Sequence, residues 1–227
     1  MYSCLDRLAT HRKIASRTAG QPLCLIAMTA PYRIMQPDLF TPALTLPEGF
    51  LYQPEFLSIT DEADLLEAFG TLPFRHAQYR EWEARRRIVS FGGHYDFSHH
   101  ALNEAPPIPT FLHALRERLA ELAGLDPSRI QHATIAEYRP GTPLGWHRDV
   151  PDFEDIMGVS LLSCARMRLR PYPPKPSQRS VHAIELAPRS AYVIRGPARW
   201  RWQHAISPTR ALRYSITFRT RRLRPDG

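Results

Sequence analysis

The sequence contains little cysteine. Its three cysteines, Cys4, Cys24 and Cys164, are an odd number in a chain of 227 residues and lack the spacing of a metal-binding motif. They therefore support neither a disulfide framework nor a thiolate zinc site. A reducing compartment, the cytoplasm, is the simplest setting for such a chain.

Long apolar runs are also absent. The longest, from Leu23 to Ala30, is interrupted by Thr29 and closed by Pro31, whereas a membrane-spanning helix needs about 20 apolar residues. We therefore expect a soluble monomer with no membrane partner. The first 45 residues lack a sustained helical or strand period, so residues 1–45 are predicted to be a poorly ordered N-terminal extension.

Glycine is scarce beside proline, and acidic residues are outnumbered by basic ones. The chain has 11 Gly against 22 Pro, which predicts many extended segments and turns. Its 22 acidic residues face 30 Lys and Arg, giving a net charge of +8. A field of this sign favours polyanionic partners, of which nucleic acid is the commonest.

The apolar periodicity predicts a mainly β protein with flanking helices, an α+β chain. One helix is predicted after a cap at Thr60 and ends at Gly70, and a second runs from Pro109 to Gly124 along a leucine stripe. After Pro127 the period becomes two, and short strands are predicted near residues 131–138, 156–162, 166–170, 181–186, 191–195 and 213–219. Short strands without intervening helices are typical of a sandwich or a jelly roll.

Two histidines and an aspartate are the first candidates for chemistry. His147 and Asp149 stand two apart, and on a strand this spacing directs both side chains to one face. Such a pair arises often by chance, but His204 later in the chain completes the two-histidine, one-carboxylate triad that leaves coordination positions open on Fe(II). The competing imidazoles lack a carboxylate two positions away on an evident strand face; they are His94, His99, His100, His132 and His182.

A run near the C-terminus predicts a strand with one polar face. Alternation separates Arg213, Ser215, Thr217 and Arg219 from Tyr214, Ile216 and Phe218. The two arginines lie roughly 20 Å apart on an ideal strand, a span that two inward-leaning side chains and a short diacid could fill. Guanidinium pairs with carboxylate bidentately, so a dicarboxylate is the natural ligand. The alternative is a pair of exposed basic residues.

Two segments together resemble the AlkB-like Fe(II)/2-oxoglutarate-dependent dioxygenase family. The first is Tyr138-Arg139-Pro140-Gly141 followed by His147-Arg148-Asp149, and the second is His204 followed by the Arg-x-Ser-x-Thr-x-Arg strand at 213–219. The resemblance implies a double-stranded β-helix, or jelly roll, over residues 131–222. It also implies a single domain over residues 46–227, in which residues 46–130 hold helices and a substrate-recognition lid.

The resemblance also implies Fe(II), with 2-oxoglutarate and O2 as cosubstrates. Iron would be held by His147, Asp149 and His204. Arg213 with the Tyr138 hydroxyl would take the distal carboxylate of 2-oxoglutarate, Arg219 would support the near carboxylate, and Ser215 would lie beside them. The implied reaction is oxidative demethylation of an alkylated base in DNA or RNA, which releases formaldehyde, succinate and CO2.

The sequence departs from the family pattern at three positions. Base-repairing members commonly have Asn two residues before the motif tyrosine, where this chain has Ala136, and Ser215 replaces the Asn of the last strand. Both changes remove amide contacts near the cosubstrate. The founding bacterial type reads the base with an acidic residue two positions after the ligand aspartate. Here that position is Pro151, and Asp152, the next residue, is the candidate for this contact.

The substrate is predicted from a basic, aromatic segment. Trp82 and Tyr95 are expected to stack on an extruded or single-stranded base, Tyr95 being the favoured contact. The adjacent run Arg85, Arg86 and Arg87 is expected to bind phosphate, although a solvated basic face is the plainer interpretation. Two alternatives stay open: a 2-oxoglutarate-dependent hydroxylase or demethylase of a protein side chain, and a non-catalytic β-domain that binds nucleic acid.

Overall fold

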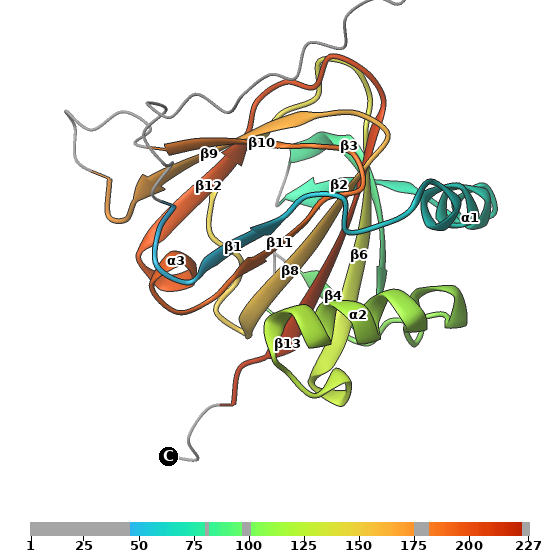
Figure 1. Ribbon diagram of the computed structural model, residues 1–227, viewed down its shortest axis with the longest axis horizontal. Helices are drawn as coiled ribbons and strands as arrows, with labels where there is room; N and C mark the ends of the chain where they lie inside the picture. Colours follow the sequence, from blue (N-terminus) through green and yellow to red (C-terminus); the bar gives the residue numbers. More distant parts are fainter. Residues whose placement is uncertain (1–45, 80–81, 97–100, 175–181, 224–227) are drawn as a thin grey trace, which may run out of the picture. The chain divides into compact units, whose positions relative to one another are not determined.

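The computed structural model describes residues 46–79, 82–96, 101–174 and 182–223 (Figure 1). The predicted extension, residues 1–45, lies outside them. The helices are α1 (Ile59–Phe69), α2 (His113–Ala123) and α3 (Gly196–Trp200), with 3-10 turns at Thr110–Leu112 and Pro127–Arg129. The strands are β1 (Phe50–Gln53), β2 (Arg75–Tyr79), β3 (Trp82–Phe91), β4 (His94–Asp96), β5 (Ala101–Asn103), β6 (Ile130–Tyr138), β7 (Leu144–His147), β8 (Phe153–Leu161), β9 (Ala165–Pro171), β10 (His182–Leu186), β11 (Ala191–Ile194), β12 (Trp202–Ile206) and β13 (Arg213–Arg221).

These strands form two large antiparallel sheets. The larger has seven strands in the order β1-β11-β8-β13-β6-β3-β2, and the smaller has four in the order β10-β9-β12-β7. β4 and β5 form a separate pair. This is the mainly β, jelly-roll architecture with flanking helices that the sequence predicts. The six strands predicted after Pro127 correspond to β6, β8, β9, β10, β11 and β13.

Helices α1 and α2 cover one face of the seven-stranded sheet, called here its outer face. Leu65 and Phe69 of α1 and Leu115 and Leu119 of α2 belong to one buried cluster with Phe218 of β13. Each large apolar side chain buried in this way contributes about 1.5–3 kcal/mol. The apolar stripes read from the sequence are therefore the residues that hold the helices to the sheet.

A second apolar cluster lies between the two sheets. It joins Ile156 of β8 and Ile194 of β11 with Met167 and Leu169 of β9 and Ile206 of β12. Side chains alternate along a strand. Each strand of the larger sheet therefore sends one set of side chains to the helix-covered outer face and the other set to the inner face, toward the smaller sheet. The space between the sheets is where the polar residues described below also meet.

The helix ends show where local sequence decides the structure. Ser58, and not the predicted Thr60, caps α1: its hydroxyl accepts from the Asp61 amide at 3.0 Å, and the Asp61 carboxylate accepts from the Ser58 amide at 2.9 Å. This reciprocal capping box starts the helix earlier. α2 ends at Gly124, whose φ of +64° is left-handed and suits glycine. No helix in the described ranges is both long and apolar enough to cross a bilayer.

Candidate metal and cosubstrate site

Neighbouring strands of the four-stranded sheet bring His147 and His204 together. His147 is the last residue of β7, His204 is the middle residue of β12, and the two are register partners. Their ring centroids are 4.2 Å apart. β12 also pairs with β9 on its other side, so the backbone of the buried His204 is held from two directions.

Asp149 reaches the same place from the loop that follows β7. Residues 148–150 are not strand, so Asp149 and His147 converge through a turn of the chain and not through the strand alternation that we expected. One ligand atom from each of Asp149, His147 and His204 lies within 4.8 Å of the other two. The Asp149 Oδ2 atom is 3.7 Å from His204 Nε2, and His147 Nδ1 is 2.9 Å from the Gly145 carbonyl oxygen. With Nδ1 donating to that carbonyl, the His147 Nε2 lone pair is available to a metal.

The protonation states of the three residues suit metal binding. Burial lowers the pKa of His204 to about 3, with the neighbouring His147 acting in the same direction. Burial also lowers the pKa of His147, although the Asp149 charge opposes it. Burial of Asp149 works against ionisation, but Arg219 and the two histidines outweigh it and hold the pKa of that carboxyl well below its usual range. At neutral pH the site therefore offers two neutral imidazoles and one carboxylate, the donor set that suits Fe(II).

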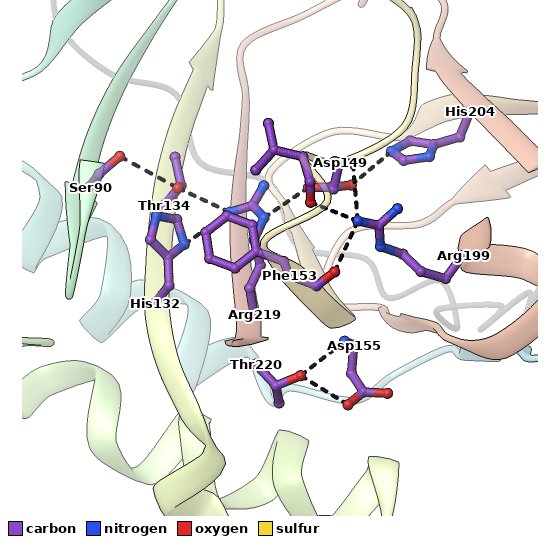
Figure 2. Close-up of polar contacts among 11 residues, drawn as sticks. Ser90, His132, Thr134, Asp149, Phe153, Asp155, Arg199, His204, Arg219 and Thr220 are labelled. Atoms are coloured by element: carbon purple, nitrogen blue, oxygen red, sulfur yellow. Dashed lines mark hydrogen bonds and ion pairs between the residues drawn. The ribbon is translucent and has the colours of Figure 1, made fainter. Parts of the chain in front are cut away.

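Arg219 of β13 fixes the Asp149 carboxylate (Figure 2). Its Nε donates to Asp149 Oδ1 at 2.8 Å, while its Nη1 donates to Thr134 Oγ1 at 3.1 Å and lies 3.2 Å from His132 Nδ1. Thr134 in turn lies 3.5 Å from the Ser90 hydroxyl. These contacts run across β13, β6 and β3. The larger sheet therefore orients Asp149, whereas the two histidines beside it belong to the smaller sheet. His132, considered above only as a competing ligand, belongs to this support.

Arg199 of α3 holds the loop that carries Asp149, a role that is not predictable from the sequence. The side chain is buried, and its Nη2 donates to the carbonyl oxygens of Asp149 at 3.0 Å, Val150 at 2.8 Å and Phe153 at 3.0 Å (Figure 2). Three bonds from one buried cation, to two residues of the loop after β7 and to the first residue of β8, restrict where the ligand aspartate can lie. Among 30 basic residues, nothing in the pattern around Arg199 distinguishes it.

Arg213 lies at the start of β13 and is almost fully buried. Its Nε donates to the Ser160 hydroxyl at 2.9 Å, and its guanidinium lies 5.0 Å from the ring centroid of Tyr138. Its buried Nη1 has no hydrogen-bond acceptor in the described part of the chain. A buried cationic donor without a partner is costly, so a carboxylate ligand fits here. Ser215, the next inward residue on β13, is also buried and is the register partner of Ser160.

Tyr192 of β11 lines the same space and was not predicted. Burial raises its pKa to about 12, with Arg213 acting in the opposite direction. Its register partner on β8 is Gly158, where a Cβ atom would lie 2.2 Å from the Tyr192 ring carbon Cζ. The glycine therefore makes room for the aromatic ring. The register between β8 and β11 therefore explains why residue 158 is a glycine.

The triad, Arg213 and Arg219 all line one cavity of about 820 Å³. Its other basic and aromatic lining residues are Arg86, Tyr138, Trp146, Arg148, Phe153, Tyr172, Tyr192, Arg199 and Trp200. A volume of this size exceeds what a five-carbon diacid fills, since drug-sized ligands occupy pockets of about 300–1,000 Å³. The cavity therefore has room for a second molecule beside the triad.

The structure separates the predicted substrate residues. Arg86 lines the cavity, Arg85 is exposed, and Arg87 lies on the other face of β3. There, in place of the expected phosphate contact, its Nη2 donates to Glu137 Oε2 at 2.6 Å and its Nε to Oε1 at 2.9 Å. A solvated basic position thus describes Arg85, whereas Arg87 forms an internal ion pair.

The remaining predicted substrate contacts lie on β3, on β4 and before β8. Trp82 begins β3 and Tyr95 lies on β4, but their side chains are outside the part of the structure that is described. Asp152 precedes β8, and its carbonyl oxygen accepts from the Arg222 amide at 2.8 Å. Pro151 lines the cavity, whereas Asp152 is not one of the described lining residues.

A jelly roll that joins two histidines and one carboxylate beside a buried arginine defines the class of non-haem Fe(II) oxygenases. A family model for the 2OG-Fe(II) oxygenase superfamily matches residues 49–223. The chain belongs to this superfamily and is one of its AlkB-like members. The superfamily uses Fe(II), 2-oxoglutarate and O2, so the chain is a dioxygenase, and the donor set described above fits that cofactor and cosubstrate.

Two curated relatives support the AlkB-like assignment. The Arabidopsis thaliana protein called alkylated DNA repair protein ALKBH8 homolog is 27% identical over 195 residues, covering 74% of this chain and 53% of that protein. The Mus musculus protein called tRNA (carboxymethyluridine(34)-5-O)-methyltransferase ALKBH8 is 29% identical over 170 residues, covering 72% of this chain and 25% of that protein. The chain thus spans a quarter to about half the length of these relatives.

Solved structures support the fold. OsALKBH1 superposes with a TM-score of 0.60 at 18% identity, covering 77% of this chain and 98% of that one. A prolyl hydroxylase from Trichoplax adhaerens, solved with a peptide of hypoxia inducible factor, gives a TM-score of 0.53 at 17% identity, covering 77% and 84%. At these identities the likeness concerns the jelly roll alone.

Proposed function

We propose that this protein oxidatively removes alkyl groups from bases in DNA or RNA. The observation that carries the proposal is the cavity around the triad, whose walls combine positive charge with aromatic rings: Arg86, Arg148, Trp146, Tyr172 and Trp200. A nucleotide offers the two matching features, a phosphate and a base with a π-face. The net charge of +8 acts in the same sense over longer distances.

The proposed reaction is hydroxylation of an alkyl C–H bond on the base. His147, Asp149 and His204 would hold Fe(II), which with 2-oxoglutarate and O2 would supply the oxidising power for this step. One oxygen atom enters the C–H bond and the other enters succinate as CO2 leaves. A hydroxylated N-methyl group is a hemiaminal, which breaks its C–N bond to release formaldehyde and return the proton to the base nitrogen.

The residues around the triad act by positioning. Arg219 binds Asp149 Oδ1 and leaves Oδ2 directed toward His204. The Gly145 carbonyl fixes the His147 ring. Arg199 restrains the loop on which Asp149 lies. Because outer contacts of this kind set the orientation of metal ligands, we assign Arg219 and Arg199 to the support of the metal site, with Arg219 also beside the near carboxylate of 2-oxoglutarate.

Arg213 is the proposed partner of the distal carboxylate. Its buried Nη1 is an unsatisfied donor on the cavity wall, while Ser160 holds its Nε and the Tyr138 ring backs its guanidinium. These contacts fix the plane of the guanidinium before a ligand arrives, so little side-chain freedom is lost on binding. Tyr138 and Ser215 complete the wall from β6 and β13.

The names of the relatives agree with a polynucleotide substrate without choosing between its kinds. The Arabidopsis relative is named for repair of alkylated DNA and the mouse relative for a tRNA methyltransferase. The missing amides at Ala136 and Ser215 change the cosubstrate wall and not the triad. Because one relative is named for DNA and the other for tRNA, the proposal covers both DNA and RNA.

The deciding experiment offers the iron-loaded protein a panel of methylated and etheno-modified DNA and RNA oligonucleotides. Mass spectrometry follows the loss of the alkyl group, and succinate and formaldehyde are measured in parallel. We expect one class of oligonucleotide to be dealkylated with equal amounts of formaldehyde and succinate, and His204→Ala to show neither. Succinate formation that no oligonucleotide stimulates, together with hydroxylation of a peptide, would contradict the proposal.

A further inference from the structure

β9 has one apolar and one basic face. Ala165, Met167 and Leu169 are buried in the cluster between the sheets. Alternation sends the intervening residues to the opposite face of the four-stranded sheet, and they are Arg166, Arg168 and Arg170. We call these three arginines, with Trp146 of β7 and Gln203 of β12, the β9 surface.

Trp146 connects the arginines to the edge strand β7. The guanidinium groups of Arg168 and Arg170 lie 5.0 and 4.4 Å from the centroid of its ring. β12 runs between β9 and β7, and the residue of β12 paired with Arg168 is Ala205, whose small side chain lets the indole reach across. Gln203 accepts from Arg170 Nε at 2.8 Å. Arg168 and Arg170 are therefore held by uncharged groups, namely the indole ring of Trp146 and the amide of Gln203.

The charges of this surface are not neutralised internally. Within the described ranges no carboxylate forms an ion pair with Arg168 or Arg170, and the buried Arg168 Nε has no hydrogen-bond partner. Glu185 is the register partner of Arg166 alone. Other arginines of this fold do pair with acids: Arg87 with Glu137, Arg118 with Asp61, Arg189 with Glu62 and Arg222 with Glu154. The β9 surface thus retains net positive charge for a ligand.

The surface continues into the cavity that holds the triad. Trp146 and Gln203 line that cavity, as do Arg148 and Tyr172 just beyond β7 and β9. Arg148 lies 3.6 Å from the centroid of the Tyr172 ring, which is 40% exposed. A basic, aromatic path therefore runs from the middle of the four-stranded sheet to the reaction site.

We infer that the β9 surface binds the phosphate backbone of the nucleic acid strand that presents its base to the triad. The inference rests on the proposed function and locates strand binding on β9, away from the Arg85–Arg87 run. A guanidinium that stacks on an aromatic ring keeps its N–H edge directed outward, and this edge forms paired hydrogen bonds with phosphate. Exposed aromatic rings beside it stack on bases of a single strand.

The test compares two double variants of the full-length, iron-loaded protein. Arg168→Gln with Arg170→Gln removes two charges from the β9 surface. Arg116→Gln with Arg129→Gln removes two charges from α2 and the following turn, on the opposite side of the seven-stranded sheet. The probe is a fluorescent, unmodified single-stranded oligonucleotide, and its Kd is measured by anisotropy over a series of salt concentrations. Succinate formation without oligonucleotide reports that the reaction site is intact.

We expect the β9 double variant to bind the oligonucleotide on the order of tenfold more weakly at 0.1 M salt. Each lost phosphate contact reduces the slope of log K against log salt by about 0.7 for single strands, so we expect a decrease of about 1.4. The control variant should keep the wild-type Kd and slope. Trp146→Leu should weaken binding with a smaller change of slope, because it removes stacking and not charge.

The outcomes separate this inference from the proposed function. If the wild type dealkylates an oligonucleotide and both double variants bind it equally well, the β9 assignment is wrong and the function stands. If the wild type neither binds nor dealkylates any oligonucleotide, both fail. Competition by polyglutamate as strong as that by an oligonucleotide of the same charge would also overturn the assignment, because the surface would then recognise charge alone.

Discussion

The two faces of the seven-stranded sheet differ in what they contribute. On the outer face, Ile216 and Phe218 of β13 are fully buried against the helices. On the inner face, Arg213 and Arg219 of the same strand contact Ser160 and Asp149 in the cavity. One strand therefore serves packing and chemistry at alternate positions. We therefore expect substitutions on the outer face to alter stability and substitutions on the inner face to alter the reaction. The substitutions below test this separation, beginning with the largest expected effect.

The largest expected effect is loss of turnover on the inner side. His147→Ala, Asp149→Ala and His204→Ala each remove one of three protein ligands, so each should reduce 2-oxoglutarate turnover to background while thermal unfolding stays cooperative. Succinate formation and circular dichroism measure the two properties. His76→Ala, at an exposed position on β2, is the matched control and should retain activity. Full activity in any triad variant would refute the site.

A comparable disturbance on the outer face should act on stability. Phe218→Ala leaves a cavity in the cluster formed with α1 and α2, and we expect a loss of about 3–5 kcal/mol in the free energy of unfolding. Urea denaturation measures it. Ser215→Ala, at an inner position of the same strand, removes a single hydroxyl and should unfold close to the wild type. Equal destabilisation by the two changes would abolish the distinction between the faces.

The two inward arginines should differ from each other. Arg213→Ala removes the guanidinium whose buried Nη1 lacks a hydrogen-bond acceptor. We expect the affinity for 2-oxoglutarate to fall about 100-fold, or roughly 3 kcal/mol. Arg219→Ala should weaken 2-oxoglutarate less but should lower metal affinity about 10–100-fold, because it frees Asp149. Calorimetric titrations with Mn(II) and with 2-oxoglutarate separate the two effects. Unchanged cosubstrate affinity in Arg213→Ala would show that the pocket is misassigned.

Alternation made most of this architecture predictable from the sequence. A period of two places Arg213 and Arg219 on one face and Phe218 on the other, whatever the partner strands are, and the structure agrees. The leucine stripe of α2 is predictable from the helical period of 3.6 residues. Motifs of residue type and order also identified His147, Asp149 and His204, although Asp149 converges through a loop and not along a strand.

The unpredicted part of the site depends on register and on buried polar contacts. Gly158 and Tyr192 matter to each other only because β8 and β11 pair at those positions. Arg199 is identified by the three carbonyl oxygens that it binds, and these lie 46 to 50 residues earlier in the chain. A single sequence contains no signal for such long-range partners. The same limit applies to Arg87, whose partner Glu137 lies 50 residues later in the chain.

The protonation of the site predicts how the metal-free protein responds to acid. The pKa of His204 is about 3 in the folded protein against a usual 6.5, so between these values the unfolded chain binds the proton that the folded state refuses. Stability therefore falls as the pH falls through this window, by about 2 kcal/mol for this residue between pH 6.5 and 5. Urea denaturation at both pH values measures the loss. His204→Asn should reduce it, and an undiminished pH dependence in that variant would contradict the assignment.

The smallest effects should come from the arginine run on β3, where the two faces are again distinguished. Arg87→Gln leaves the buried Glu137 with Arg139 and the Tyr214 hydroxyl as its side-chain partners among the described residues. Because Arg87 is partly exposed, we expect a loss of about 1–2 kcal/mol in stability. Arg86→Gln, next to it but lining the cavity, should leave stability unchanged and weaken binding of a modified oligonucleotide a few-fold. Urea denaturation and anisotropy titration of both variants test the contrast, with Arg85→Gln as an exposed neighbour that should change neither strongly. If Arg87→Gln weakens oligonucleotide binding as much as Arg86→Gln does, at unchanged stability, the run acts as one basic surface and the separation of the faces does not extend to β3.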